Sequence, residues 1–372
     1  MKTALVYDRV NKWGGAERVL LALHSLFPNA PLFTSVFDEK NAQWAKVFNI
    51  KTSFLQKFPH IISNHELYPF LMPIAFEQFN FDDFDLVISV TSEAAKGIIT
   101  KPGTRHICYC LTPTRYLWTG YNDYFKSDLF RFISYPAVSY LRTWDKIVAR
   151  RPDLCIAISE VVKKRIKQYY GQESEVVYPP LYMKYSHLGG GRLQRSGSHD
   201  SSQVGDSQKS NYFLVVSRLI SYKRIDIAIN ACNELQIPLK IIGAGKEEQN
   251  LRKIAGPTIE FLGNVTDEKL EYFYRQAKAL ICPGIEDFGL TIIESQKYKT
   301  PVIAFRGGGA LETIKEGKTG IFFKKQNKGS LIQKIQEFDK YNFMPVDFEK
   351  QIEEFSFKNF KSNFLSLVEK AF

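Results

Sequence analysis

The apolar positions in the first half of the chain alternate between short strand-like runs and amphipathic helical stretches. Residues 4–7 form a compact apolar run, and a break at Gly14 and Gly15 follows it. After this break, apolar residues fall at i, i+1, i+4, i+7 and i+8, which is typical of one face of a helix. We expect further strands at residues 86–90, 107–111 and 154–158, and a helix with a basic outer face over residues 160–170.

The second half of the chain repeats this alternation after a segment of different composition. Residues 186–210 hold twelve Ser or Gly among 25 positions, which predicts a flexible linker or a disordered insertion. The runs that follow are short, apolar and bounded by Gly or Pro, which is typical of a parallel sheet buried on both faces. They cover residues 213–216, 239–242, 259–261, 279–282 and 302–304.

The fold class predicted from these patterns is α/β, with two Rossmann-like αβα domains that face a central cleft. The last segment repeats aromatic residues at helical spacing and predicts a C-terminal helix that packs back on a domain surface. The predicted boundaries are an N-terminal domain at 1–185, a linker at 186–210, a C-terminal domain at 211–345 and a C-terminal helical segment at 346–372.

The sharpest chemical signal is the segment from Cys282 to Glu294. A buried strand ends at a Pro-Gly pair, Glu286 lies in the following loop, and a helix is expected to begin near Phe288 and Gly289. The free amides at a helix amino terminus bind anions, and the two glutamates can accept hydrogen bonds from hydroxyl groups. The alternative is an ordinary strand-turn-helix with two solvent-facing glutamates.

Two cations follow the first strand of the same domain. Arg218 and Lys223 lie in the loop after residues 213–216, where Arg can hold a phosphate through two hydrogen bonds and Lys adds a point charge. Taken alone, such residues are surface charges more often than ligands. Together with the glutamate loop they match the diphosphate, sugar hydroxyls and ribose hydroxyls of a sugar nucleotide.

Three segments of the second half resemble the retaining glycosyltransferases of family 4, which have the GT-B fold. They are SRLISYK at 217–223, EDFGLTIIE at 286–294, and FRGGGALET at 305–313 with GKTG at 317–320. In the first half, WGGAERV at 13–19 and HICYCLTPTRYLW at 106–118 resemble the O-antigen mannosyltransferase-like branch. The resemblance covers nearly the whole chain apart from the Ser/Gly segment.

The resemblance implies a role for each matched position. Arg218, Lys223 and Glu286 would be catalytic: the two cations neutralise the leaving diphosphate, and Glu286 holds the donor sugar. Retention through attack on the face that the nucleotide leaves needs no protein nucleophile, so catalysis would consist of leaving-group stabilisation and positioning. The implied donor-binding residues are Gly14, Gly15, Asp287, Phe288, Gly289, Leu290, Thr291 and Glu294, with Gly263, Asn264 and Val265 near the base; His106, Thr112 and Arg115 are placed on the acceptor side.

One position departs from the pattern of this branch. The usual YCHTP is YCLTP here, so Leu111 stands where a His is expected, and Leu can neither donate a hydrogen bond nor transfer a proton. His106 or a neighbour takes over, the role is dispensable, or activity is impaired. His106 lies five residues before Leu111 and therefore points to the opposite face of one strand.

We predict no metal ion and no cofactor besides a GDP- or UDP-linked sugar donor. Asp83 and Asp85 form a D-x-D pair, but they precede a strand, so a surface turn is the better interpretation. No apolar run approaches the roughly 18 residues needed to span a bilayer, and no secretion signal is recognised at the amino terminus. We expect a cytoplasmic protein with buried free cysteines that can contact the inner face of the plasma membrane.

The net charge of +11 (50 Lys and Arg against 39 Asp and Glu) fits either nucleic acid or an anionic membrane as partner. No basic cluster interleaved with aromatics supports nucleic acid. We therefore expect contact with anionic lipid through Arg150, Arg151, Lys163, Lys164, Arg165 and Lys167, helped by Trp118 and Tyr121.

The resemblance favours transfer of a hexose, mannose from GDP-mannose, to a lipid-linked or polysaccharide acceptor. A UDP-sugar-dependent transferase of the same fold, and a nucleotide-sugar-binding protein that has lost turnover, remain as alternatives.

Overall fold

A computed structural model describes residues 1–58, 68–125, 127–181 and 210–372. The chain divides into two compact units, which are described separately: Met1–Tyr182 with Ser356–Phe372, and Met183–Phe355. The predicted linker at 186–210 lies, except for Ser210, outside the described residues.

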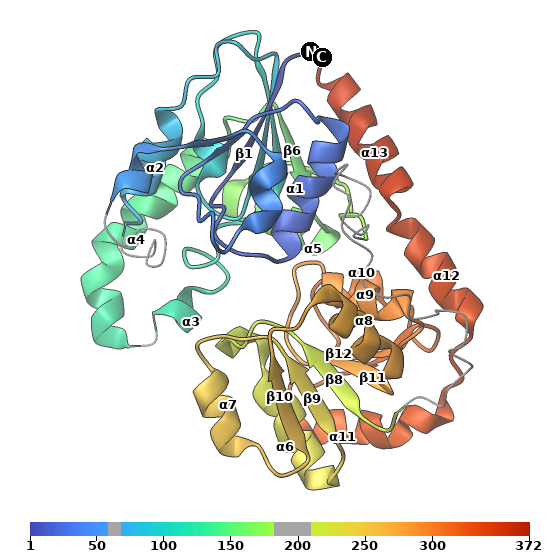
Figure 1. Cartoon of the computed structure of the whole chain (residues 1–372). Coiled ribbons are helices and arrows are strands. Elements are labelled where there is room, and N and C mark those ends of the chain that lie inside the picture. Colours follow the sequence, from blue (N-terminus) through green and yellow to red (C-terminus); the bar gives the residue numbers. More distant parts are fainter. Residues whose placement is uncertain (59–67, 126, 182–209) are drawn as a thin grey trace. The chain divides into compact units, whose positions relative to one another are not determined.

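The N-terminal unit is built on a seven-stranded parallel sheet with the order β3-β2-β1-β4-β5-β6-β7 (Figure 1). Every residue of β1 and β4 is buried, because these central strands have neighbours on both sides and helices over both faces. The strands are β1 (Thr3–Tyr7), β2 (Leu32–Thr34), β3 (Ile50–Thr52), β4 (Leu86–Thr91), β5 (Arg105–Cys110), β6 (Leu154–Ala157) and β7 (Glu175–Val176).

The helices of this unit include the three that the sequence predicts, α1 (Gly15–Leu26), α5 (Glu160–Tyr170) and α13 (Phe357–Lys370), and a long one that it does not. The predicted basic helix is α5, which ends at the left-handed Gly171, and α4 (Asp128–Val148) was not expected. The others are α2 (Leu71–Glu77), α3 (Tyr121–Tyr124) and the short 3-10 helices η1 (Gln43–Val47), η2 (Phe54–Lys57) and η4 (Ala95–Gly97).

The C-terminal unit is built on a six-stranded parallel sheet with the order β10-β9-β8-β11-β12-β13. Successive residues of one strand point to opposite faces of the sheet and enter different hydrophobic cores, as Phe213 and Leu214 do. Both faces of the sheet are therefore buried. All five strands expected here are present, together with the unexpected β13. The strands are β8 (Phe213–Val216), β9 (Leu239–Ile242), β10 (Ile259–Gly263), β11 (Ala279–Cys282), β12 (Val302–Phe305) and β13 (Gly320–Phe323).

Helices connect these strands and cover both faces of the second sheet. They are η6 (Ser221–Lys223), α6 (Ile225–Leu235), α7 (Glu248–Ile254), α8 (Asp267–Gln276), α9 (Leu290–Lys297), α10 (Ala310–Thr313), α11 (Lys328–Glu337), η7 (Phe338–Lys340) and α12 (Pro345–Glu354).

Both sheets reverse their strand order next to their first strand. The reversal lies between β1 and β4 in the N-terminal unit and between β8 and β11 in the C-terminal unit. Loops that leave the carboxyl ends of two such strands run in opposite directions, and the crevice between them is the usual ligand site of open α/β sheets. The fold therefore marks one candidate site in each unit.

The C-terminal segment is divided between the two units. Helix α12 belongs to the second unit, whereas α13 returns to the N-terminal unit and lies beside α1 (Figure 1). The buried Phe364 of α13 has its ring centroid 6.5 Å from that of Phe27 and 6.3 Å from that of Tyr109. The predicted helix that packs back on a domain is present.

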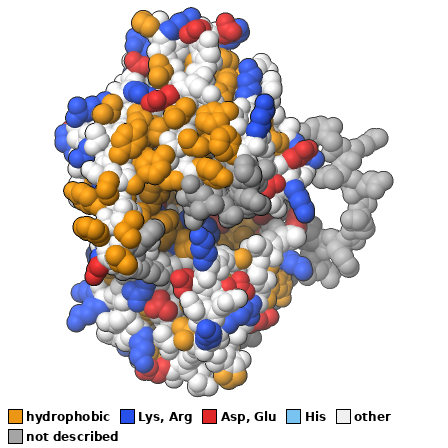
Figure 2. Space-filling view, turned by 90° about the vertical axis from the view of Figure 1, so that its left-hand side faces the viewer, with side chains coloured by type: hydrophobic (Ala, Val, Ile, Leu, Met, Phe, Trp, Pro, Cys, Tyr) orange, Lys and Arg blue, Asp and Glu red, His pale blue; other side chains and the backbone are white. Residues whose placement is uncertain are grey.

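Among the described residues, no helix is long and apolar enough to cross a membrane. The surface of the N-terminal unit nevertheless carries a broad group of exposed hydrophobic side chains over α2 and α4 (Figure 2).

The ring of Phe364 provides a test of the α13 contact. Because Phe364 is fully buried among aromatic rings, Phe364→Ala should lower the free energy of unfolding by roughly 3–5 kcal/mol. The same change at Phe372, which is exposed on the same segment, should cost less than about 0.5 kcal/mol. Urea unfolding followed by circular dichroism measures both, and equal effects would contradict the packing described here.

Candidate functional site

The order reversal of the second sheet brings Lys223 and Glu286 together. Lys223 ends η6 in the loop after β8, and Glu286 lies in the loop after β11. The Lys223 ammonium donates a hydrogen bond to Glu286 Oε2 at 2.5 Å, and the two side chains are 13% and 16% exposed. The sequence analysis placed both residues in the catalytic set, and the structure joins them in one ion pair.

A glycine permits this close approach of the two loops. A Cβ atom at Gly284 would lie 2.8 Å from the Lys223 Cα atom, closer than real Cβ atoms come. The Pro-Gly pair after β11 is therefore explained by the passage of the Lys223 backbone. The loop is also tied to the glycine run after β12, because the Gly309 amide donates to the Glu286 carbonyl at 2.8 Å.

Arg218, the other predicted cation, is exposed at the same sheet edge. Its guanidinium donates to the Tyr222 hydroxyl at 2.8 Å, and the Lys223 ammonium lies 5.5 Å from the centroid of the Tyr222 ring. Tyr222 thus contacts both cations, Arg218 through its hydroxyl group and Lys223 through its ring. An exposed guanidinium beside a partly buried ammonium is a chemically suitable pair for two phosphate groups.

The predicted turn from the loop into a helix is present at the start of α9. Gly289 caps the helix in the left-handed region (φ 98°), and its carbonyl accepts the amide hydrogen of Ile292. Leu290 and Thr291 form the first turn of α9, where backbone amides and the helix dipole favour an anion. Asp287, half-buried, and Phe288, buried, complete the loop that leads into this turn.

Neither glutamate of the EDFGLTIIE segment faces solvent freely, which excludes the alternative of two solvent-facing glutamates. Glu294 is 8% exposed, and its Oε2 atom accepts a hydrogen bond from the Tyr274 hydroxyl at 3.1 Å. This hydrogen bond was not foreseen. If Glu294 binds a ribose, the ribose hydroxyls and the Tyr274 hydroxyl would have to share its carboxylate as hydrogen-bond acceptor.

The thiol of Cys282, at the end of β11 just before this loop, is not a candidate nucleophile. Burial, and to a smaller extent Glu286, raise the pKa of the Cys282 thiol well above its ordinary value. The group stays protonated at neutral pH, and a thiol is a much weaker nucleophile than a thiolate.

Three predicted residues lie on the same edge of the sheet but not at the ion pair. Gly263 ends β10, and Asn264 and Val265 follow it. In the sheet, β9 and β8 stand between β10 and β11. The structure therefore places the segment predicted to hold the base at the outer strand, two strands away from the one that precedes Lys223.

The order reversal of the first sheet is occupied by Asp8, which the sequence analysis missed. Asp8 follows β1 and is buried, and it accepts hydrogen bonds from Thr91 Oγ1 at 2.9 Å, the Ser92 amide at 2.7 Å and the Ala95 amide at 2.8 Å. Burial, followed by the charge of Glu93, raises the pKa of Asp8. Donors from the protein itself thus fill this crevice.

A buried aspartate on α4 fixes the loop that contains Leu111, Thr112 and Arg115. Asp145 has no solvent exposure. Its carboxylate forms an ion pair with Lys96 Nζ at 2.6 Å. It also accepts hydrogen bonds from Thr114 Oγ1 at 2.9 Å, Trp118 Nε1 at 2.7 Å and the Tyr170 hydroxyl at 2.8 Å. In the sequence, the only indication that Asp145 has a structural role is its position among the apolar residues of the inner face of α4.

Gly14 and Gly15 lie at the start of α1, after β1. Just inside α1, the buried Glu17 accepts a hydrogen bond from the Tyr7 hydroxyl at 2.7 Å. The WGGAERV motif therefore has an internal structural function beside any contact with a ligand.

Residues 198–355 match the family model described as glycosyl transferases group 1. This part of the chain is therefore similar to the group 1 glycosyl transferases. The relatives include an O-antigen chain mannosyltransferase C from Escherichia coli (25% identical over 209 residues, 53% of this chain and 52% of the relative). Another is a GDP-mannose-dependent alpha-(1-6)-phosphatidylinositol monomannoside mannosyltransferase from Mycolicibacterium smegmatis. It is 24% identical over 197 residues, which are 48% of this chain and 51% of the relative. The chain spans about half the length of these curated relatives.

The fold comparison covers both units. A crystal structure of HepE from Anabaena in complex with UDP matches with a TM-score of 0.68 over 100% of both chains, at 17% sequence identity. The GT-B fold and the resemblance to glycosyltransferase family 4 are therefore confirmed. The roles of individual residues stay predictions.

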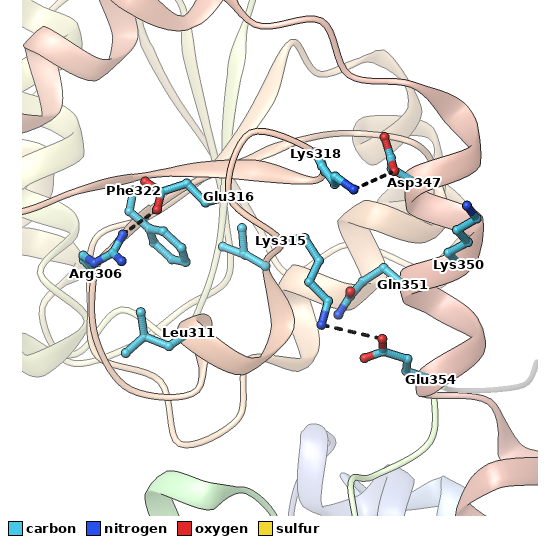
Figure 3. Close-up of a pocket in the computed structure, with 11 residues that line it drawn as sticks. Arg306, Leu311, Lys315, Glu316, Lys318, Phe322, Asp347, Lys350, Gln351 and Glu354 are labelled. Atoms are coloured by element: carbon cyan, nitrogen blue, oxygen red, sulfur yellow. Dashed lines mark hydrogen bonds and ion pairs between the residues drawn. The ribbon is translucent and has the colours of Figure 1, made fainter.

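The C-terminal unit also has a pocket of about 590 Å³ whose lining includes none of the predicted donor residues (Figure 3). It lies beside α12, and the ion pairs Arg306–Glu316 (2.6 Å), Lys315–Glu354 (3.6 Å) and Lys318–Asp347 (3.9 Å) line it. Because six of its seven charged side chains pair with one another and Lys350 alone adds a further charge to the lining, we assign no ligand to it. Among the described residues, no group of three or more His, Cys, Asp or Glu side chains is placed to hold a metal ion.

His106 does not lie with Thr112 and Arg115. It is in the amino-terminal half of β5, fully buried, with its Nε2 atom 2.8 Å from Ser89 Oγ and its backbone amide bonded to Asp153. Thr112 and Arg115 follow the carboxyl end of the same strand. The alternation of the strand gives the direction of the His106 side chain but not its burial, so the prediction of His106 as an acceptor-side residue conflicts with its position.

The buried His106 predicts a specific pH dependence of stability. Burial, assisted by Arg151 and opposed by Asp153, lowers the pKa of His106 from 6.5 to about 3. Below pH 6.5 the unfolded chain therefore takes up a proton that the folded chain refuses, and stability falls as the pH falls. Between pH 7 and pH 5 this residue should cost about 2 kcal/mol.

Urea unfolding at the two pH values, compared between the native chain and His106→Gln, isolates this contribution. Between pH 7 and pH 5, the free energy of unfolding of the variant should fall by about 2 kcal/mol less than that of the native chain. Equal losses would show that His106 is protonated in the folded state.

Proposed function

We propose that the chain is a retaining glycosyltransferase that moves a hexose, mannose from GDP-mannose, to a lipid-linked or polysaccharide acceptor in cell-envelope glycan synthesis. The Lys223–Glu286 pair at the order reversal of a group 1 glycosyl transferase domain carries the proposal. The names of two relatives, an O-antigen chain mannosyltransferase and a GDP-mannose-dependent mannosyltransferase, support mannose as the sugar.

The geometry suits stabilisation of a leaving nucleoside diphosphate. Lys223 has three N–H donors and gives one to Glu286, so two remain for phosphate oxygens. Arg218 and the amides of Leu290 and Thr291 would hold the rest of the diphosphate. Glu286 keeps one carboxylate oxygen for a sugar hydroxyl. These groups are in place before the reaction, so little reorganisation accompanies the charge that develops on the leaving group.

The proposed reaction needs no protein nucleophile. The bond from the sugar C1 atom to the phosphate oxygen breaks, and the acceptor oxygen forms a new C1–O bond on the same face. The acceptor proton passes to the leaving diphosphate, which balances the charge. No metal ion enters this scheme, because Arg218 and Lys223 supply the positive charge.

Two alternatives rest on specific observations. The HepE structures contain UDP or UDP-glucose, so a UDP-sugar donor is a close alternative. A nucleotide-sugar-binding protein without turnover is the second, because Leu111, which is almost completely buried at the carboxyl end of β5, stands where the related branch has a His.

A donor screen decides among these three. Incubation with radiolabelled GDP-mannose, other GDP-sugars and UDP-sugars should give labelled product, or released nucleotide, with GDP-mannose, and the rate should be unchanged by EDTA. Product only from a UDP-sugar would replace the donor in the proposal. Binding measured by calorimetry without product would establish the binding protein, and strict dependence on Mg²⁺ would contradict the metal-free scheme.

Substitutions test the ion pair itself. Lys223→Ala and Glu286→Ala should each lower kcat/KM by about 100-fold or more, because each removes charge stabilisation in the transition state. The matched control is the pair Lys278–Asp339, at 2.8 Å in the same unit, where Lys278 precedes β11 and so lies at the opposite edge of the sheet. Lys278→Ala and Asp339→Ala should leave kcat/KM within about twofold, and near-native rates in Lys223→Ala would refute the site.

A further inference from the structure

Helix α4 is apolar on two opposite faces. Its inner face carries the buried Val138, Leu141 and Val148 and the paired Asp145. The outer face is also apolar, with Phe132 82% exposed and Leu129 69% exposed. The outer residues lie one, three, four or seven positions apart, as residues on one face of a helix do. They form one stripe, which we call the α4 stripe: Leu129, Phe132, Ile133, Pro136, Tyr140 and Ile147.

The α4 stripe continues onto α2. Phe70, directly before α2, and Ile74 within it are both exposed, and the Phe70 ring centroid lies 6.3 Å from that of Tyr140. Figure 2 shows hydrophobic side chains gathered on one face of the N-terminal unit. Soluble proteins rarely leave so many large neighbouring apolar side chains in water, so the patch indicates a surface that binds something.

Positive charge borders the patch. Lys146 on α4 and Arg150 just after it are exposed. Arg131 pairs with the exposed Asp128 at 2.9 Å, and the half-exposed Arg142 adds a further positive charge beside the Tyr121 ring. Glu77 of α2 is neutralised by Arg151 at 2.8 Å. The surroundings of the stripe are therefore cationic, and a partner of negative charge is favoured.

We propose that the α4 stripe is a docking surface for an anionic lipid bilayer. The helix would lie in the plane of the interface, with Phe132 and Ile133 at the level of the upper acyl chains and the bordering Arg and Lys residues among the headgroups. No described helix can span a bilayer, so the contact is peripheral. A second copy of this chain fits less well, because it would bring the same positive border against the first.

This surface differs from the one that the sequence suggested. Trp118 and Tyr121 were expected to enter the membrane, but the Trp118 ring stacks on Tyr169 at 5.1 Å and its Nε1 atom donates to Asp145. The Arg142 guanidinium lies 4.6 Å from the centroid of the Tyr121 ring. These aromatic rings hold α4 on the unit, and the residues free to insert are on its other side.

Vesicle co-sedimentation with the full chain tests the proposal. Vesicles of phosphatidylcholine with phosphatidylglycerol should bind the chain, and vesicles of phosphatidylcholine alone should bind it much less. Phe132→Ser/Ile133→Ser should lower the partition coefficient by about tenfold or more. The control Ile254→Ser/Tyr272→Ser removes exposed apolar side chains from the C-terminal unit and should bind like the native chain.

Two results would overturn the proposal. One is vesicle binding that does not depend on anionic lipid or on Phe132 and Ile133. The other is a dimer in analytical ultracentrifugation that Phe132→Ser/Ile133→Ser dissociates, which would make the stripe an interface between two copies. Circular dichroism must show native folding of the variant, as expected for exposed positions.

The proposal rests on the proposed function only in that a lipid-linked acceptor would be reached at such a surface. Calorimetric titration of GDP-mannose into the same variants separates the two. Donor binding without vesicle binding would reject the docking surface alone, and vesicle binding without binding or transfer of any donor would reject the proposed function alone.

Discussion

The reversal of strand order in each sheet is the constraint on which the candidate site depends. Polar groups that follow two neighbouring parallel strands emerge at one crevice, where they must find partners away from bulk water. In the first sheet, the donors around Asp8 come from the loop after β4 and fill the crevice. In the second, one cation meets one carboxylate, and both keep hydrogen-bonding capacity for a ligand. The same topology therefore gives a filled structural junction in one unit and, in the other, an ion pair that keeps hydrogen-bonding capacity.

Long, continuously apolar strands could be predicted from the sequence, and most elements beyond them could not. The apolar runs at β4, β8 and β11 are bounded by turn residues, so these strands can be located from the sequence alone. Strands β2, β3 and β7 have only two or three residues, too few for a pattern to emerge. Helix α4 was missed for another reason: its apolar residues extend from the buried face to the exposed face, so they do not form the single core-facing stripe of an ordinary surface helix. Pro136 in its middle also argues against a helix in sequence.

The site shows the same division between local and tertiary information. Motif spacing predicted that Lys223 and Glu286 serve one site, because both follow strands whose carboxyl ends share an edge. Spacing could not show that Tyr274 would donate to Glu294, since Tyr274 lies on α8 and only packing brings it there. Asp145 was hidden in the same way: its four donors come from separate segments of the chain.

Asp145 also connects the two faces of α4. A carboxylate without solvent exposure is stable only while its donors remain, and removal of one leaves a buried charge partly unpaired. Burial disfavours the Lys96 cation, yet Asp145 beside it leaves the pKa of Lys96 raised, so the ammonium stays charged. The network therefore fixes the inner face of α4 to Thr114 and Trp118, in the loop that follows β5. A bilayer bound at the outer face would be held at a set height relative to that loop, within one rigid element. Positioning a lipid-linked acceptor would then follow from the packing of a single helix, without any moving part.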